Sequence, residues 1–135
     1  MSLSHAATVL QSDLEALATR FLEAWNSQDV DRVLACYTED LVYRDPNTRS
    51  PVVGAEAMRR YLQKLFAAWQ MTWALREAHE LASGDGAAIL WRATFRRAGQ
   101  EAVVEADGMD LVCLEGLRAR RNEVYFDRSI LASLG

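Results

Sequence analysis

The first half of the chain places apolar residues at the three- and four-residue steps of amphipathic helices. The clearest run lies between residues 12 and 28 and predicts a helix with one broad apolar face. Ser12 and Glu15 have the spacing of a capping box, and residues 1–11 are expected to be either a frayed arm or the first turn of this helix. The apolar positions of the helix are Leu14, Leu17, Ala18, Phe21, Leu22 and Trp25.

Two further helices and one short strand are predicted before the middle of the chain. A short helix capped by Asp29 is expected to include Tyr37 and to end within residues 38–40. Residues 41–44 form a short strand, which the following Asp-Pro pair ends because proline has no amide hydrogen for a strand ladder. After a polar loop, a third helix is predicted over residues 54–69.

The second half of the chain alternates apolar and polar residues with the period of half-buried strands. Strands are predicted at 71–81 and 87–97, a long hairpin at 101–127 and a short final helix at 129–134. Three helices followed by a four-stranded, mainly antiparallel meander predict an α+β fold in one domain, residues 1–135. The helices must cover the concave face of the curved sheet, and the open end of this cone is the expected place for a pocket.

Composition and charge exclude several classes of function. The net charge of −4 and the pI near 5.2 argue against nucleic acid or an anionic membrane surface as the partner. The N-terminal residues lack the basic segment of a signal peptide and no apolar run could span a membrane, so a cytoplasmic location is expected. Cys36, Cys113, His5 and His79 form no metal motif, and we expect neither a metal nor a cofactor.

Three carboxylates in or beside apolar strands are the candidates for catalysis. Asp110 must be exposed, paired with an arginine, or held at a raised pKa in a pocket, and it faces the helices if the strand alternation continues past Gly108. Asp45 is either a turn residue that binds backbone amides or a base at the pocket mouth. Asp127 either faces the pocket together with Tyr125 or caps the final helix.

The pocket is expected to bind a small, flat, apolar molecule against aromatic rings. The residues predicted to contact this molecule are Phe21, Trp25, Tyr43, Trp91 and Tyr125. The opposite face of the long hairpin is expected to be apolar, which predicts a homodimer through the outer face of the sheet. The residues assigned to that face are Leu111, Cys113, Val124 and Phe126.

Several short motifs follow one another between about residues 14 and 134. They are FLEAWNSQD at 21–29, YTED at 37–40, YRDP at 43–46, Gly54, GMD at 108–110 and YFD at 125–127. Their order and spacing resemble the nuclear-transport-factor-2-like superfamily, and within it the SnoaL-like polyketide cyclases and the ketosteroid isomerase-like proteins.

This resemblance implies cofactor-independent acid/base chemistry, isomerisation or cyclisation, on a small carbonyl compound. It places Asp45 as the general base, Asp110 as a protonated acid in the oxyanion hole, and Asp127 as the acid/base residue of the cyclases. The tyrosine of the isomerases corresponds to Phe21, which has no hydroxyl, and the partner histidine of the cyclases has no counterpart here. Because this fold also hosts non-catalytic proteins, a dimeric ligand-binding module and a protein-interaction domain stay open as alternatives.

Overall fold

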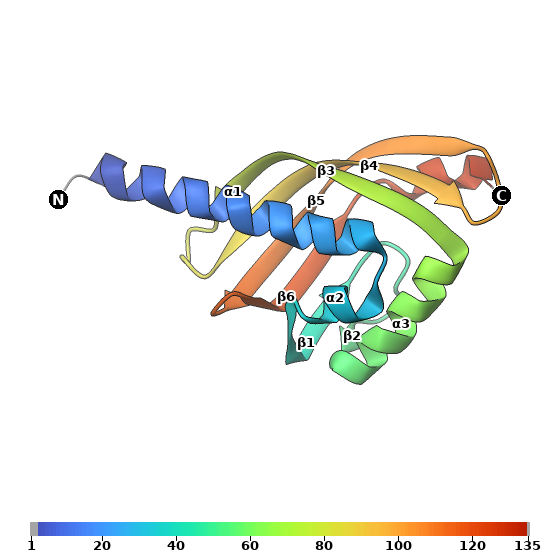
Figure 1. Ribbon diagram of the computed structural model, residues 1–135, viewed down its shortest axis with the longest axis horizontal. Coiled ribbons are helices and arrows are strands. Elements are labelled where there is room, and N and C mark those ends of the chain that lie inside the picture. Colours follow the sequence, from blue (N-terminus) through green and yellow to red (C-terminus); the bar gives the residue numbers. More distant parts are fainter. Residues whose placement is uncertain (1–2, 135) are drawn as a thin grey trace.

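Three helices and a six-stranded sheet make up the protein (Figure 1). The computed structural model describes the backbone of residues 3–134 and the side chains of residue 11 and residues 13–134. No helix in this described part is long and apolar enough to cross a membrane. The elements are α1 (Leu3–Ser27), α2 (Val30–Leu34), β1 (Tyr37–Arg44), β2 (Val52–Val53), α3 (Ala55–Ala68), β3 (Trp69–Glu80), β4 (Gly86–Arg97), β5 (Val103–Glu115), β6 (Arg118–Tyr125) and the 3₁₀ helix η1 (Arg128–Leu134).

The sheet has the strand order β2-β1-β6-β5-β4-β3. Strands β3 to β6 form the predicted antiparallel meander, while β1 pairs with β6 in parallel and with β2 antiparallel. Strand β1 begins at Tyr37, so the prediction that Tyr37 and residues 38–40 belong to the second helix is wrong. The pairing of Tyr37 with Ala119 of β6 overrides the local helical pattern.

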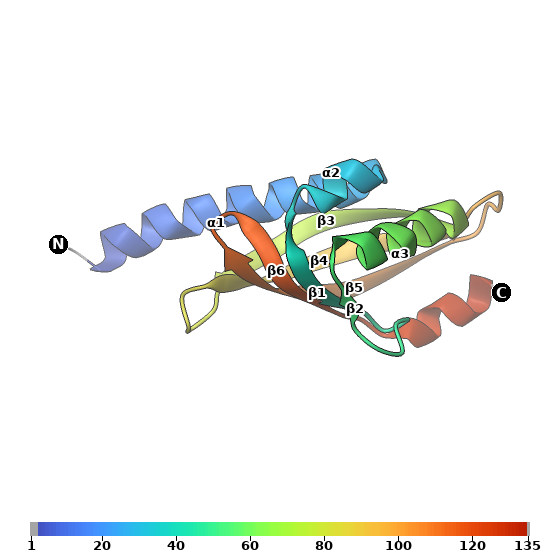
Figure 2. The same ribbon diagram turned by 90° about the horizontal axis from the view of Figure 1, so that it is seen from below.

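The three helices lie on the concave side of the sheet (Figure 2). Helix α1 begins at Leu3 and passes through Ser12, so the predicted capping box does not start it. Helix α2 begins as predicted, because the carboxylate of Asp29 accepts hydrogen bonds from the amides of Asp31 and Arg32 at 3.0 and 3.2 Å.

The last turn of α1 fastens the helix to β3, which is an edge strand. The side-chain amide of Asn26 makes two hydrogen bonds with the backbone of Trp73, at 2.6 and 2.9 Å. Gln28 bonds the backbone N–H of Met71 at 2.7 Å and the carbonyl of Trp69 at 3.0 Å. These bonds occupy edge groups that would otherwise be free to pair with another chain, and they hold α1 above the wide end of the cone.

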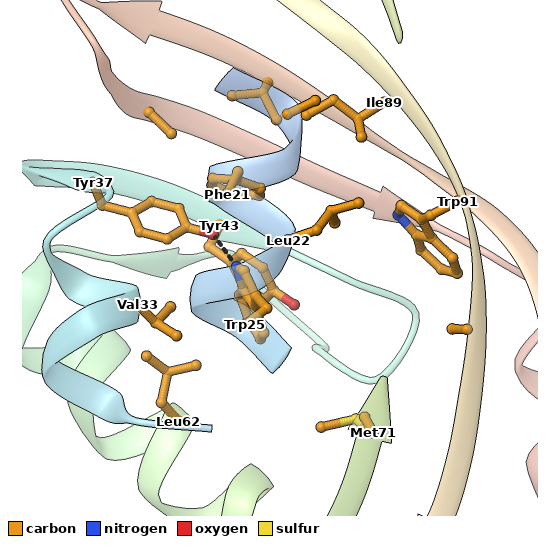
Figure 3. Close-up of a cluster of buried hydrophobic side chains, with 14 of the residues drawn as sticks. Phe21, Leu22, Trp25, Val33, Tyr37, Tyr43, Leu62, Met71, Ile89 and Trp91 are labelled. Carbon is orange, nitrogen blue, oxygen red and sulfur yellow. Dashed lines mark hydrogen bonds between the residues drawn. The ribbon is translucent and has the colours of Figure 1, made fainter. Parts of the chain in front are cut away.

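The core fills the space between the helices and the concave face (Figure 3). The predicted inner face of β4 is confirmed, because Ile89, Trp91, Ala93 and Phe95 are all at most 4% exposed. Trp25 of α1 points toward Tyr37 of β1 (Figure 3) and donates a hydrogen bond to its hydroxyl. The Trp25 ring also stacks on Tyr43, so helix and sheet are joined in the core as well as by the edge bonds.

The outer face of the sheet differs from the prediction. Val124 and Phe126 lie on the concave side, whereas their neighbours Arg121, Glu123 and Tyr125 face outward. The predicted phase of this strand is therefore wrong, because burying three ionisable side chains on one face is unfavourable, whereas burying two apolar side chains is favourable.

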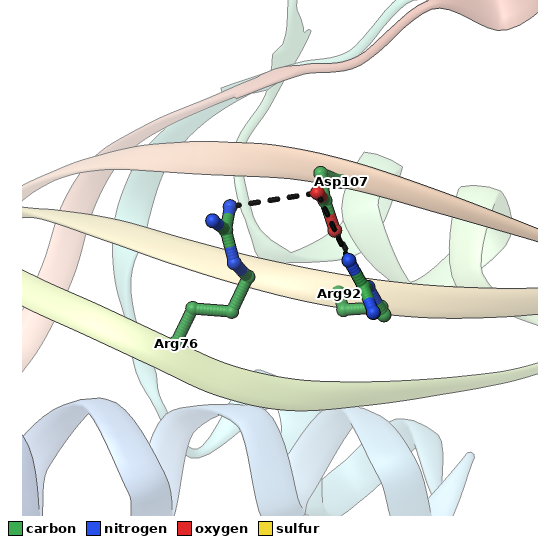
Figure 4. Close-up of polar contacts among 3 residues, drawn as sticks. All are labelled: Arg76, Arg92 and Asp107. Atoms are coloured by element: carbon green, nitrogen blue, oxygen red, sulfur yellow. Dashed lines mark hydrogen bonds and ion pairs between the residues drawn. The ribbon is translucent and has the colours of Figure 1, made fainter.

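Charged residues also cover the outer face of the neighbouring strands. Arg92 bonds Asp107 at 2.9 Å, and Arg76 approaches the same carboxylate at 3.7 Å (Figure 4). His79 is exposed and paired with Glu77 at 2.7 Å, as expected for a polar strand residue. The outer face is thus less apolar than the sequence had suggested.

Candidate functional site

A cavity opens between the concave face of the sheet and the ends of α1 and α3. Including its open mouth it spans about 570 Å³, of which the centres of water-sized molecules can reach about 40 Å³. Four tryptophans occur in the sequence and all four line it. The lining residues are Leu22, Trp25, Tyr43, Asp45, Asn47, Leu65, Trp69, Met71, Trp73, Trp91, Phe95, Asp110, Asn122, Val124, Phe126 and Leu131.

Asp110 projects from β5 into the closed end of this cavity. It is 6% exposed, pairs across the sheet with Ile89 and Val124, and forms no ion pair with any residue that the structure describes. Burial raises the pKa of Asp110 to about 7, and the negative charge of Asp45 adds to this rise. The predicted orientation of Asp110 toward the helices is confirmed. A carboxyl with this pKa is present in both protonation states near neutral pH.

Trp91 of β4 lies beside Asp110 and is fully buried. Its indole N–H lowers the pKa of Asp110, although Nε1 has no partner at full hydrogen-bonding geometry within the described part of the chain. A buried N–H without a partner costs free energy, so this donor is unsatisfied in the described chain.

A chain of buried polar groups supports the other side of Asp110. The indole N–H of Trp25 donates to the hydroxyl of Tyr37 at 3.2 Å, and that hydroxyl donates to Oδ1 of Asn122 at 2.7 Å. The Asn122 amide donates to the carbonyl of Leu111 at 3.2 Å and also lowers the pKa of Asp110. Burial and the nearby Asp110 raise the pKa of Tyr37, so its phenol stays protonated and can keep donating to Asn122.

Asp45 lines the same cavity and also forms a turn with the residues that follow it. Its Oδ1 accepts from the amides of Asn47 and Thr48 at 2.8 and 3.1 Å, which is the predicted turn. Its Oδ2 accepts from the hydroxyl of Tyr43 at 2.7 Å and from the hydroxyl of Tyr61 on α3. Burial and then Asp45 raise the pKa of both phenols, which keeps them as donors.

The structure brings Asp45 and Asp110 together in one cavity, but not Asp127 or Tyr125. Asp127 is exposed, and its carboxylate accepts from the amide of Ser129 at 2.9 Å, as in the alternative of a cap on the final helix. Tyr125 is 50% exposed and bonded to Glu123 on the outer face. The expectation that these two residues face the pocket is wrong, because the alternate positions of this segment, Val124 and Phe126, face the cavity instead.

The predicted ligand-contact residues divide in the same way. Trp25, Tyr43 and Trp91 line the cavity, whereas Phe21 packs behind it with its ring centroid 5.6 Å from that of Tyr37. Phe21 is therefore a core residue in this structure.

Sequence reasoning missed two polar residues of the site. Asn122, Val124 and Phe126 are spaced two residues apart and all line the cavity. This alternation of an uncharged amide with two apolar residues is the signal that could have identified the inner face of the strand. Tyr61 has no such signal in the sequence, because its hydrogen bond to Asp45 depends on how α3 packs against β1.

The chain was compared with known proteins. The model of the SnoaL-like domain family matches residues 18–122. No curated protein gives a significant match. Solved structures with 16–17% sequence identity to this chain share its fold at TM-scores of 0.75–0.77.

Three of these structures illustrate the range of the fold. A protein of ketosteroid isomerase-like fold from Catenulispora acidiphila, in complex with trimethylamine, is 17% identical with a TM-score of 0.77, covering 88% of this chain and 92% of that chain. TerC, co-crystallised with polyporic acid, is 16% identical with a TM-score of 0.75 and coverages of 88% and 95%. The epoxide hydrolase/cyclase-like enzyme SalBIII of salinomycin pyran ring formation is 17% identical with a TM-score of 0.76 and coverages of 88% and 94%.

The family match extends over residues 18–122, and the three solved structures cover 88% of this chain. Both agree with the motif order and with the observed cone of helices and sheet. The chain therefore belongs to the SnoaL-like domain family and has the nuclear-transport-factor-2-like fold.

Proposed function

We propose that the cavity is the active site of a cofactor-independent isomerase or cyclase that moves a proton on a small, largely apolar carbonyl compound. The observation that carries this proposal is Asp110, a buried carboxyl without an ion-pair partner in the described chain, whose pKa is raised to about 7. Two carboxyls in one apolar cavity can divide the roles of acid and base without a metal or cofactor.

In this proposal Asp110 and Trp91 hold the carbonyl oxygen of the substrate. Protonated Asp110 donates one hydrogen bond and the unpartnered indole N–H of Trp91 donates the second. The hydroxyl that Phe21 lacks is then not needed, because Trp91, beside Asp110, supplies the second donor.

Asp45 is the candidate base. It removes a proton from the carbon next to the carbonyl while Asp110 and Trp91 stabilise the resulting enolate, and it returns the proton to another carbon of the conjugated system. Tyr43 and Tyr61 fix the position of its carboxylate at the cavity mouth. One tyrosine hydrogen bond must loosen for Asp45 to accept the proton.

The test is isomerisation of β,γ-unsaturated cyclic ketones, beginning with 3-cyclohexen-1-one, whose conjugated product absorbs in the ultraviolet. We expect turnover by the native protein and a loss of about 100-fold or more in kcat/KM for Asp45→Asn and Asp110→Leu. Asp110→Asn keeps a hydrogen-bond donor and is expected to lose less than Asp110→Leu. Asp107→Asn, on the outer face, is the matched control. Full activity in a folded Asp110→Leu variant would overturn the assignment.

A second candidate is a non-catalytic binding module with the same cavity. The carboxylate of Asp45 already accepts four hydrogen bonds, and this favours a structural role in the cavity lining over a role as catalytic base. Two relatives of this fold are known with small molecules, trimethylamine and polyporic acid. Binding of the ketones without turnover, unchanged in Asp45→Asn, would favour this candidate.

We also propose a homodimer, through a smaller apolar surface than the sequence predicted, because Val124 and Phe126 line the cavity. The half-buried side chains of Leu90, Met109 and Leu111 adjoin one another on the outer face of β4 and β5, between the charged groups. Light scattering at micromolar concentration tests the dimer, and Leu111→Glu should disrupt it.

A further inference from the structure

A second hollow adjoins the mouth of the cavity and has a different chemical character. Measured in the same way as the 570 Å³ of the cavity, it spans about 770 Å³ including open solvent, and we call it the outer hollow. The residues that line it come from the loop after β1, the α3–β3 junction, the end of β4 and η1. The α3–β3 junction and η1 lie toward the same end of the molecule (Figure 2). Its lining residues are Asn47, Trp69, Arg97, Arg128, Ser129, Leu131 and Ala132.

The outer hollow and the cavity are neighbours. Asn47, Trp69 and Leu131 line both, so these three side chains stand at the boundary between them. Among the described residues, those that line the cavity include two carboxyls and no lysine, arginine or histidine, while those that line the outer hollow include two arginines and no carboxylate. The charge of the lining therefore changes sign from the cavity to the outer hollow.

Arg97 is held in a fixed position in the outer hollow. Its guanidinium carbon lies over the ring of Trp69, 4.9 Å from the centroid. Its Nε is buried and has no hydrogen-bond partner among the described residues. A carboxylate pairs with a guanidinium through two of its nitrogens, and the described residues provide no such partner for Arg97.

Neither arginine of the outer hollow is neutralised by the described part of the chain. Arg97 and Arg128 form no ion pair with the residues that the structure describes, in contrast to Arg92 and Arg121 on the outer face of the sheet. Asp127, next to Arg128 in sequence, instead accepts from the backbone amide of Ser129. Two guanidinium groups without a carboxylate partner among the described residues make the outer hollow attractive to an anion, although the net charge of the chain is −4.

We infer that the outer hollow binds the carboxylate of an amphipathic organic acid whose flat apolar body occupies the cavity. The carboxylate pairs with Arg97 and Arg128, because the carboxyls of Asp45 and Asp110 would repel it from the inner end. The apolar body packs against the tryptophans, and the ligand enters with its uncharged end first. This inference deepens the proposed function by naming the substrate class, and it rests on the cavity binding a ligand but not on proton transfer.

The experiment compares naphthalene-2-carboxylate with its neutral counterpart naphthalene-2-carboxamide by calorimetry at neutral pH. We expect the acid to bind about 10-fold or more tightly than the amide, and added salt to weaken only the acid. Arg97→Gln and Arg128→Gln should each remove most of this preference and leave the affinity for the amide nearly unchanged. Arg97→Lys keeps the charge over Trp69 but loses the paired geometry, so it should restore only part of the preference.

Arg92→Gln is the matched control, because it removes an arginine from the outer face of the sheet and should leave both affinities unchanged. Equal affinity for acid and amide, binding of neither, or an equal loss in Arg92→Gln would overturn the inference. Turnover of the neutral ketone by the native protein is measured in parallel, because this substrate has no carboxylate. A failure of the carboxylate subsite and a failure of the proton-transfer proposal can therefore be told apart.

Discussion

Gly108 of β5 lies directly beneath the indole ring of Trp91 of β4. The two residues pair across the strands, and a Cβ atom at position 108 would come within 2.4 Å of Cη2 of that ring. The missing side chain lets the ring lie across β5, which brings the indole N–H beside Asp110. One glycine thus controls the position of the second proposed donor.

Gly108→Ala should displace the Trp91 ring and destabilise the fold by about 1–3 kcal/mol, the usual cost of overpacking a filled core. The added methyl would also meet the carbonyl oxygen of Tyr125 at 2.7 Å, so the backbone cannot simply absorb it. Urea unfolding and near-ultraviolet circular dichroism measure the two effects. In a Trp91→Phe background the smaller ring should relieve much of the cost, and an equal cost in both backgrounds would contradict this account.

The stability of the protein should fall as pH rises, because of Asp110. The folded state holds this proton more tightly than the unfolded chain, since the pKa is about 7 when folded and 3.8 in the reference state. Stability from this proton is complete below the lower value and is lost as pH rises through the higher one. Relative to Asp110→Asn, the native protein should lose on the order of 4 kcal/mol between about pH 4 and pH 8.

Parallel urea titrations of the native protein and Asp110→Asn across this pH range provide the measurement. The contributions of groups that titrate in both proteins cancel in the difference between the two unfolding free energies. Asp107→Asn, which removes a carboxyl from the outer face, is the control. A difference that does not change with pH would show that Asp110 titrates normally.

Removing the hydroxyl of Tyr61 should loosen the cavity mouth. Tyr61→Phe deletes one of the two phenol donors to Oδ2 of Asp45, and a hydrogen bond to a charged group contributes about 1.5–3 kcal/mol. Tyr43→Phe should act similarly, because its hydroxyl bonds the same oxygen. Equilibrium unfolding measures both losses, and the double variant should fall short of their sum if the two phenols share one acceptor.

The buried pair of Tyr37 and Asn122 should show strong coupling. Asn122→Leu leaves the Tyr37 hydroxyl and the Leu111 carbonyl without their partner, at about 1–3 kcal/mol for each buried group. With Tyr37→Phe already in place, the same change should cost less. A double-mutant cycle on unfolding free energies measures the coupling, and additive losses would count against the network.

Much of the fold was predictable because hydrophobic periodicity is a local property. The inner face of β4, the meander from β3 to β6 and the Asp29 cap all follow from spacing and capping chemistry. Strand β1 was harder to predict, because its first residues gain their structure from distant pairing with β6.

The candidate site was only partly predictable for a related reason. Asp110 stood out because a carboxylate in an apolar strand must be exposed, paired, or held at a raised pKa in a pocket. The phase of β6 was misjudged, which moved Asp127 and Tyr125 into the expected pocket and Asn122 out of it. Contacts such as Tyr61 with Asp45, or Arg97 with Trp69, depend on packing between elements that no local pattern records.

The most direct test of this account is the titration of the Asp110 carboxyl itself, followed by carbon-13 NMR of labelled aspartate. Asp110→Asn assigns the resonance, and Asp107 provides an outer-face reference whose pKa is lowered by its hydrogen bond to Arg92. The account predicts a pKa of about 7 for Asp110 in the unliganded protein. A value near 3.8 would contradict it, because Asp110 would then be ionised at neutral pH and could not donate the proposed hydrogen bond.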